Sequence, residues 1–171
     1  MVLTNPMITG TQSLEHILET LDTPEEIYAT EIIPSQSSYM QSDDVLAWQH
    51  SLYHEITASI DGYLSRDEQE DFTTTLLYAI ENAWMHGNNQ DAEQPIEVHI
   101  YSGDNGLLFE VCDQGCGFDV ASTIGNFYNG SESTEVYYHN LGMGMETFEK
   151  SVCLISYNEL GNACYGVLRH D

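Results

Sequence analysis

The chain has 171 residues, 42% of them hydrophobic, which is enough for one domain with a substantial core and too few for two ordinary domains. It contains 28 acidic and three basic residues, a formal net charge of -25, and this charge argues against direct binding to nucleic acid. No apolar run is long enough to span a bilayer and the N-terminus has no signal-peptide pattern, so we expect a cytoplasmic protein without membrane contact.

The acidity has two interpretations, because the acidic residues are scattered rather than gathered in blocks. They can form a solvated surface suited to a salty cell, or they can serve a basic partner, including a nucleic-acid-binding protein for which the chain is a decoy. The four cysteines contain no Cys-x-x-Cys pair, which argues against a zinc site and favours reduced, packed thiols.

The N-terminal part of the chain is polar and mixed in composition. Residues 1–26 are predicted to be an extension, with a short helix over residues 12–21 that ends before Pro24. Residues 27–33 are rich in β-branched and aromatic side chains and stop at Pro34, which is typical of an edge strand.

Two long helices are expected next. Apolar residues recur at helical spacing from Ser42 to about Asp61, which predicts an amphipathic helix. Ser65 and Glu68 have the spacing of a capping box, so a second helix should begin at about Arg66 and end at Gly87, in a left-handed terminator.

Four strands are predicted in the second half of the chain. Residues 96–101 and 107–112 read as an antiparallel pair around a turn-rich segment. A closing hairpin is predicted from residues 152–157 and 163–169. Since these strands follow two long helices, the expected fold is α+β, a two-layer sandwich with the helices on one face of a sheet.

The segment between the two pairs of strands shows no regular pattern. Residues 114–140 lack clear periodicity and are too long for an ordinary connection, so we expect a mobile loop that could act as a lid. Residues 141–150 should form a short helix after it.

Three short motifs occur in order along the chain. Residues 81–88 read Glu-Asn-Ala-Trp-Met-His-Gly-Asn, residues 113–118 read Asp-Gln-Gly-Cys-Gly-Phe, and residues 141–145 read Leu-Gly-Met-Gly-Met. The second motif offers a carboxylate and two glycines at a strand end, and the third offers glycines where backbone N–H groups at a helix start can face phosphate. Together they indicate a nucleotide site.

In this order the motifs resemble the asparagine box and two glycine boxes of the GHKL, or histidine-kinase-like, ATPase domain. The first motif looks most like the branch of anti-sigma-factor serine/threonine kinases. The resemblance covers roughly residues 27–170, and it implies an ATP-binding domain over residues 27–171 with the two-layer sandwich called the Bergerat fold.

The resemblance also implies roles for single residues. Asn82 is the position that binds Mg²⁺ through its side-chain oxygen, although a structural amide bonded to the backbone is the alternative. His86 lies beside the nucleotide, or it caps the helix end as a cation. Asp113 accepts the adenine amino group while Gly115 and Gly117 let the backbone approach the base, and a tight Asp-x-Gly turn is the alternative.

The remaining positions concern phosphate binding and catalysis. Gly142, Gly144 and Met145 match the second glycine box, where the phosphates of ATP or ADP are held. The family usually has a catalytic Glu four residues before the asparagine, and Tyr78 stands there instead. A tyrosine is protonated at neutral pH and is a poor general base. Glu81 is a poor replacement, because it points about 100° away from Asn82 around the helix.

Two functions remain as hypotheses. The first is a regulator that binds Mg-ATP and engages a sigma factor, or an antagonist protein with a phosphorylatable serine, as a monomer or a homodimer. The second is a catalytically inactive interaction module, with or without bound nucleotide. A sensor histidine kinase is disfavoured, since no dimerisation helix with a phosphoacceptor histidine precedes the domain.

Overall fold

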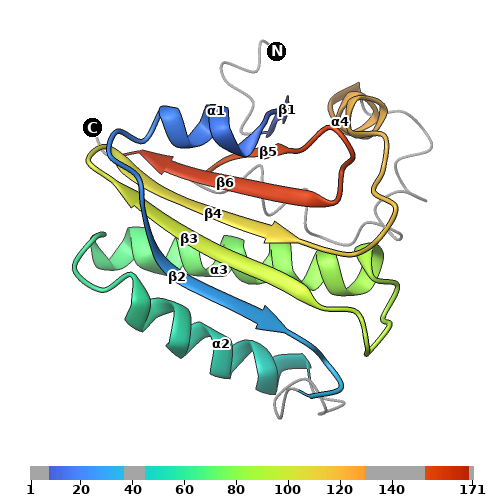
Figure 1. Ribbon diagram of the computed structural model, residues 1–171, viewed down its shortest axis with the longest axis horizontal. Helices are drawn as coiled ribbons and strands as arrows, with labels where there is room; N and C mark the ends of the chain where they lie inside the picture. Colours follow the sequence, from blue (N-terminus) through green and yellow to red (C-terminus); the bar gives the residue numbers. More distant parts are fainter. Residues whose placement is uncertain (1–7, 37–44, 130–152, 170–171) are drawn as a thin grey trace.

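The fold is a single mixed sheet with helices on both faces (Figure 1). The computed structural model describes residues 8–36, 45–129 and 153–169. Within these ranges six strands lie in the order β1-β5-β6-β4-β3-β2, accompanied by four α-helices. The elements are β1 (Ile8–Thr11), α1 (Leu14–Glu19), β2 (Glu25–Ile32), α2 (Val45–Ser59), α3 (Arg66–Asn82), β3 (Ile96–Gly103), β4 (Gly106–Cys112), α4 (Val120–Asn129), β5 (Leu154–Tyr157) and β6 (Ala163–Arg169). The predicted α+β class is confirmed.

The sheet is antiparallel except at one edge. β2, β3, β4, β6 and β5 pair antiparallel in that spatial order, and β2 is the edge strand that the sequence predicts. Along β3, Ile96, Val98 and Ile100 are fully buried while the residues between them are half-buried. This alternation places the apolar side chains on one face and leaves the other face to polar residues.

The buried face of the sheet is covered by α2 and α3 (Figure 1). Phe72 of α3 packs edge-to-face on Phe109 of β4, with ring centroids 5.5 Å apart, and both side chains are fully buried. The capping box that the sequence predicts is present, because the Ser65 N–H donates to Glu68 Oε2 at 2.9 Å. The predicted start of the first long helix, at Ser42, lies outside the described residues.

The end of the second long helix differs from the prediction. α3 stops at Asn82, and residues Ala83–Gly87 continue as a π-helical turn, η1. Gly87 is not left-handed; the positive φ angles occur after it, at Asn89 and Gln90. The prediction of a left-handed terminator at Gly87 is therefore wrong. The packing role of this glycine is described with the functional site.

The irregular loop predicted for residues 114–140 is wrong over its centre, where α4 forms. Asp119 caps this helix, since its Oδ1 accepts the Ser122 N–H at 2.9 Å, and Val120, Ile124 and Phe127 pack against the main core. These three apolar residues recur at helical spacing, but the polar residues on either side make this periodicity hard to recognise in the sequence. The remainder of the predicted lid, from residue 130, and the predicted helix over residues 141–150 lie outside the described residues.

The segment predicted as an extension contributes to the sheet and to a second core. The unpredicted strand β1 pairs parallel with β5, and α1 spans only Leu14–Glu19 of the helix predicted over residues 12–21. α1 packs on the sheet face opposite α2 and α3, where Ile17 and Leu21 contact a cluster that includes Leu108 and Tyr165. A strand this short and polar leaves no recognisable pattern in the sequence.

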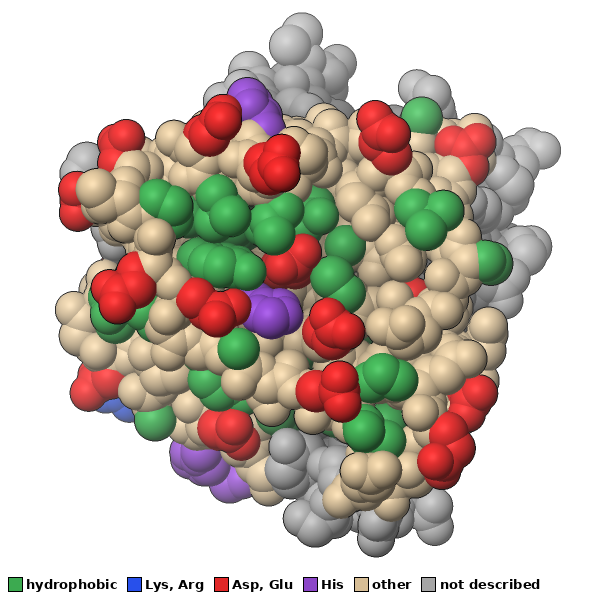
Figure 2. Space-filling view, viewed as in Figure 1, with side chains coloured by type: hydrophobic (Ala, Val, Ile, Leu, Met, Phe, Trp, Pro, Cys, Tyr) green, Lys and Arg blue, Asp and Glu red, His purple; other side chains and the backbone are tan. Residues whose placement is uncertain are grey.

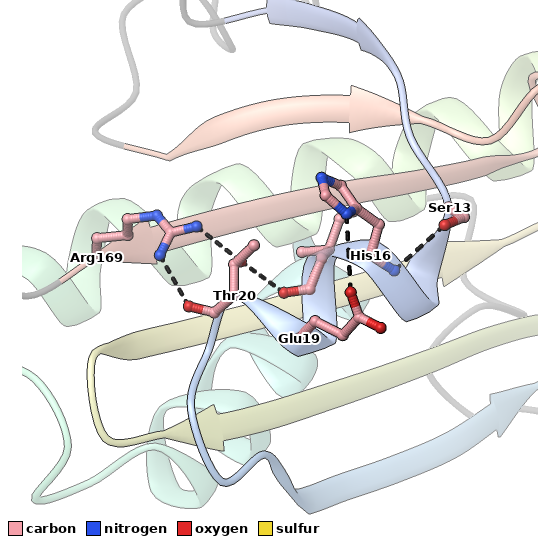
Figure 3. A network of polar contacts seen from close by, with 6 residues as sticks. Ser13, His16, Glu19, Thr20 and Arg169 are labelled. Atoms are coloured by element: carbon pink, nitrogen blue, oxygen red, sulfur yellow. Dashed lines mark hydrogen bonds and ion pairs between the residues drawn. The ribbon is translucent and has the colours of Figure 1, made fainter.

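Polar contacts hold both ends of α1 (Figure 3). At its start the Ser13 hydroxyl accepts the His16 N–H at 3.2 Å. At its end Arg169 of β6 donates to the Thr20 carbonyl at 3.0 Å and to the Thr20 hydroxyl at 2.7 Å. The helix is thereby joined to the last strand. No helix within the described ranges combines the length and apolar character needed to cross a membrane.

We expect the Ile17→Ala substitution to destabilise the whole domain by about 2–5 kcal/mol, because it removes a fully buried side chain and leaves a cavity between α1 and the sheet. The free energy of unfolding is measured by urea denaturation. His16→Ala, on the exposed side of the same helix, serves as control and should change it by less than about 0.5 kcal/mol. Equal, small effects of both variants would mean that α1 is a dispensable appendage.

Candidate functional site

A cavity of about 310 Å³ opens where α3 and β4 end. Its walls come from α3 and η1, from the loop after β4, from Thr123 of α4, and from the β5–β6 hairpin. The volume lies at the lower end of the range for sites that hold small molecules. The cavity is the candidate functional site.

The cavity brings together residues that the sequence predicts from two separate motifs. Asn82 and His86 line it from the first motif, and Asp113 and Gly117 line it from the second. Gly115 lies directly behind this lining, in contact with Gly87. The third predicted motif, with Gly142, Gly144 and Met145, lies outside the described residues.

Gly87 and Asp113 form the closest contact between the two motifs. A Cβ atom on Gly87 would overlap the carboxyl group of Asp113, and one on Gly115 would overlap the carbonyl oxygen of Gly87. At Gly115 the obstacle is backbone, so a side chain there would force the two segments apart, whereas at Gly87 it is the end of the Asp113 side chain, which would have to turn away from its present position. Gly87 therefore serves close approach to Asp113 and not a left-handed turn.

Asn88 holds the same junction together with hydrogen bonds, a role that no sequence pattern predicts. Its Oδ1 accepts the Gln114 N–H at 2.7 Å, and its Nδ2 donates to the carbonyls of Gln94 and Pro95 at 3.1 Å. The side chain is almost fully buried, at 2% exposure. Because the Gln114 N–H lies 26 residues along the chain, in the second motif, only the assembled fold identifies Asn88 as a residue that positions the site.

The β5–β6 hairpin closes the opposite wall of the cavity. Asn158 Oδ1 accepts the backbone N–H groups of Gly161 and Asn162 at 2.7 and 3.0 Å, which fixes the turn. The Asp113 N–H donates to the Asn162 carbonyl at 2.9 Å, so the hairpin also holds the end of β4. Gly117 has a φ of 73° and presses against the Leu160 backbone, where a Cβ would not fit.

Asn82 presents an amide to the cavity without a partner among the described residues. It lines the wall, is half-buried, and makes no side-chain hydrogen bond that caps the following turn. The predicted alternative of a structural amide bonded to the backbone thus finds no support in the described part of the chain. An amide in this position is available to a ligand or to an ion.

The two candidates for a catalytic base lie away from the cavity. Glu81 Oε2 accepts a hydrogen bond from Gln49 Nε2 of α2 at 3.1 Å, so this carboxylate faces the neighbouring helix. Tyr78 is half-buried and packs against the main core, and it is not among the residues that line the cavity. Neither side chain contributes a proton acceptor to the cavity wall.

Burial sets the protonation behaviour of the site. It raises the pKa of Asp113 from 3.8 to about 6, an effect that the Gly115 N–H, donating to Oδ1 at 2.8 Å, opposes. Desolvation by burial lowers the pKa of His86, which favours the neutral imidazole over the helix-capping cation. No Lys or Arg lines the described walls.

The described residues contain no group of three or more His, Cys, Asp or Glu side chains placed to hold a metal ion. A tightly caged metal is thus not a feature of this part of the chain. Mg²⁺ in nucleotide sites commonly has one or two protein ligands, with phosphates and waters completing its shell. The Asn82 side-chain oxygen is suited to that arrangement.

No protein family matches the chain, and no curated protein shows significant similarity to it.

We expect Asp113→Asn to stabilise the protein at pH 7.5 and to have a smaller effect near pH 4. Because folding raises this pKa, the carboxyl group contributes stability that is fully present below pH 3.8 and is lost as the pH rises through about 6. The neutral asparagine side chain is not subject to this loss. The expectation is tested by measuring the melting temperatures of the wild type and Asp113→Asn between pH 4 and 7.5. A melting-temperature difference that is constant over this range would show that the Asp113 carboxyl is not desolvated in the folded protein.

Proposed function

We propose that the chain is an ATP-binding regulatory protein, with a GHKL-type domain of the Bergerat fold. The observation that supports this proposal is the meeting of Asn82 and Asp113, far apart in the sequence, on the walls of one cavity. The strand–helix junction between them leaves no room for side chains at Gly87 and Gly115. This is the arrangement that the sequence motifs imply for adenine and Mg²⁺.

Asp113 is suited to recognise adenine. Its Oδ1 already accepts the Gly115 N–H, while its Oδ2 accepts no hydrogen bond from the described residues and is free for the exocyclic amino group. The neighbouring backbone at Gly117 has no side chain to obstruct a flat ring. At pH 7 the carboxyl group, with a pKa of about 6, is mainly ionised and can act as an acceptor.

The phosphates would extend from adenine past Asn82, whose side-chain oxygen would hold Mg²⁺. Gly142, Gly144 and Met145 belong to the motif that would supply backbone donors to the phosphates. Since the described walls contain no Lys or Arg, Mg²⁺ must supply most of the charge that balances a triphosphate. Binding should therefore depend strongly on Mg²⁺.

The biological setting that fits this proposal is the cytoplasm, where the protein would act as an anti-sigma-factor serine/threonine kinase does. It would engage a sigma factor, or an antagonist protein with a phosphorylatable serine, and would respond to ATP or ADP. The asparagine motif supports this branch of the family.

The binding step is tested by calorimetric titration of the protein with ATP and Mg²⁺. We expect a Kd in the micromolar range, weakened about tenfold or more by Asn82→Ala or Asp113→Asn. Gln114→Ala is the matched control, because that side chain is exposed and only its backbone N–H is used in the site. Asp113→Asn is informative because it should fold more stably than the wild type, so lost binding could not be assigned to unfolding. No heat of binding at millimolar ATP would refute the proposal.

A second candidate is a domain that binds nucleotide without turnover. It is favoured by one observation, the tyrosine at the position of the general base, packed against the core rather than exposed in the cavity. A protonated phenol does not take up a proton from water or from a hydroxyl group, so it cannot act as the general base. ATP would then act as a structural ligand that sets the affinity for the partner.

We expect Tyr78→Glu to leave the rate of ADP release unchanged, because residue 78 packs against the core and is not among the described residues that line the cavity. Purified protein is assayed for ADP under saturating Mg-ATP. Tyr78→Phe retains the packing and provides the control, which should also remain at the wild-type rate. A gain of about 10²-fold in Tyr78→Glu, with undiminished ATP binding, would show instead that this position reaches the reacting phosphate and can supply the missing base.

A further inference from the structure

The sheet face opposite α2 and α3 carries a group of acidic and aromatic side chains that the nucleotide cavity does not use. We call it the open sheet face; it is the face turned toward the viewer in Figures 1 and 2. α1 covers its β6 side and contacts Leu108 of β4, while β2 and β3 remain uncovered. Its members are Glu26, Ala29, Glu31, Glu97, His99, Tyr101, Glu110 and Cys112.

The strand register places these side chains in rows across the sheet. His99 lies opposite Ala29 on one side and Glu110 on the other, and Glu110 lies opposite Tyr165. In the next row Glu31 lies directly opposite Glu97. Like charges directly opposite each other destabilise a sheet, and β2, β3 and β4 contain no Lys or Arg that could separate them.

Glu110 is the central carboxylate of the open sheet face and is poorly satisfied within the described chain. It is only 8% exposed, and its one hydrogen bond there comes from the Cys112 thiol, a weak donor, at 3.5 Å. Burial raises its pKa. A carboxylate this deeply set favours a cation as neighbour, because the cation would replace the hydration that burial has removed.

Aromatic rings border this carboxylate. Tyr165 lies opposite it, and Tyr101 lies on the neighbouring row. Burial, together with the negative charges of Glu110 and Glu26, raises the pKa of Tyr101 to about 12, so its ring stays neutral. Tyr165 is buried, at 4% exposure, but the half-buried ring of Tyr101 lies next to carboxylates and is suited to a Lys or Arg side chain, which gains both ionic and cation–π contacts.

The one histidine of the open sheet face, His99, already contacts a glutamate of the same face. His99 Nδ1 contacts Glu26 Oε1 at 2.6 Å, and the remaining carboxylates of the face have no comparable partner among the described residues. This one histidine faces four glutamates, Glu26, Glu31, Glu97 and Glu110, and could offset the charge of at most one of them. The face therefore stays acidic at neutral pH.

A second copy of this chain is a poor occupant of the open sheet face. Each copy would bring a charge of -25 and a face with four glutamates. The chain has three Lys and Arg residues; of these, Arg169 is already bonded to Thr20, and Lys150 lies outside the described residues. Charge complementarity thus favours a different, basic molecule.

We propose that the open sheet face binds a basic protein partner, whose Lys or Arg side chains lie against Glu26, Glu97 and Glu110 beside Tyr101. The surface is a broad, nearly flat sheet with a hydrophobic patch next to the acidic groups (Figure 2), which suits another protein surface better than a small cation. This inference deepens the proposed function, because it gives the chemistry of the regulatory partner, but it does not require an occupied nucleotide cavity.

The test uses a defined probe, acetylated and amidated hexalysine, titrated into the isotopically labelled full-length protein at about 0.15 M salt, where long-range attraction is screened. We expect the largest amide shift changes at His99, Tyr101 and Glu110. Substituting Glu26, Glu97 and Glu110 together by Gln should weaken binding about tenfold. The matched control substitutes Asp61 by Asn and Glu70 and Glu93 by Gln, which removes the same charge from exposed positions away from this face and should change affinity less than about twofold.

Three results would overturn the proposal. Shift changes centred on other elements would place the basic site elsewhere. Equal weakening by the two triple variants would mean that hexalysine responds only to net charge. A wild-type protein that sediments as a dimer, with the open sheet face protected from hydrogen exchange, would make a second copy the occupant.

The same variants separate this proposal from the proposed function. ATP binding to the sheet-face triple variant should equal that of the wild type, because the cavity lies at the end of the strands and uses none of the three residues. Absence of ATP binding in the wild type would refute the nucleotide site while leaving the hexalysine result unaffected. Normal ATP binding with no localised peptide binding would refute the open sheet face alone.

Discussion

The close approach of Gly87 to Asp113 is the contact on which the candidate site depends. It brings the end of a helix against the end of a central strand, at a separation that excludes a side chain on the glycine. Asn88 and the β5–β6 hairpin then hold this junction through backbone hydrogen bonds. Asn82 and Asp113 line the same cavity from the two sides of this junction. Packing at one point thus determines the chemistry available at the site.

Negative charge is the second constraint, and it acts differently at the two surfaces. In the cavity, burial holds the Asp113 carboxyl at a pKa near 6, and the walls offer no cationic side chain. On the open sheet face, Glu110 is buried among other carboxylates and tyrosines. A protein with 28 acidic and three basic residues cannot balance both surfaces from its own side chains. In our proposals the balancing positive charge comes from outside, as Mg²⁺ in one case and as a basic partner in the other.

Local sequence signals predicted the elements that depend on near neighbours. The Ser65–Glu68 capping box, the alternating strand β3 and the β5–β6 hairpin all form as expected, because each rests on contacts within a few residues. The sequence did not predict features that depend on contacts with segments distant in the chain. β1 gains its hydrogen bonds from β5, more than a hundred residues away, and Asn88 gains its role from backbone groups of other segments. α4 is an exception, since Val120, Ile124 and Phe127 recur at helical spacing within the segment.

The sequence by itself determined the charge, the α+β class and the order of the motifs that contain Asn82, His86 and Asp113. These are properties of composition and of local periodicity, and they need no knowledge of which segments meet. Only the tertiary structure decided that Gly87 serves close packing, that Glu81 faces α2 while Tyr78 packs in the core, and that one sheet face remains uncovered. The physical reason is that burial and electrostatic environment arise from groups distant in the chain, so the same residue types acquire their function only after the layers have packed.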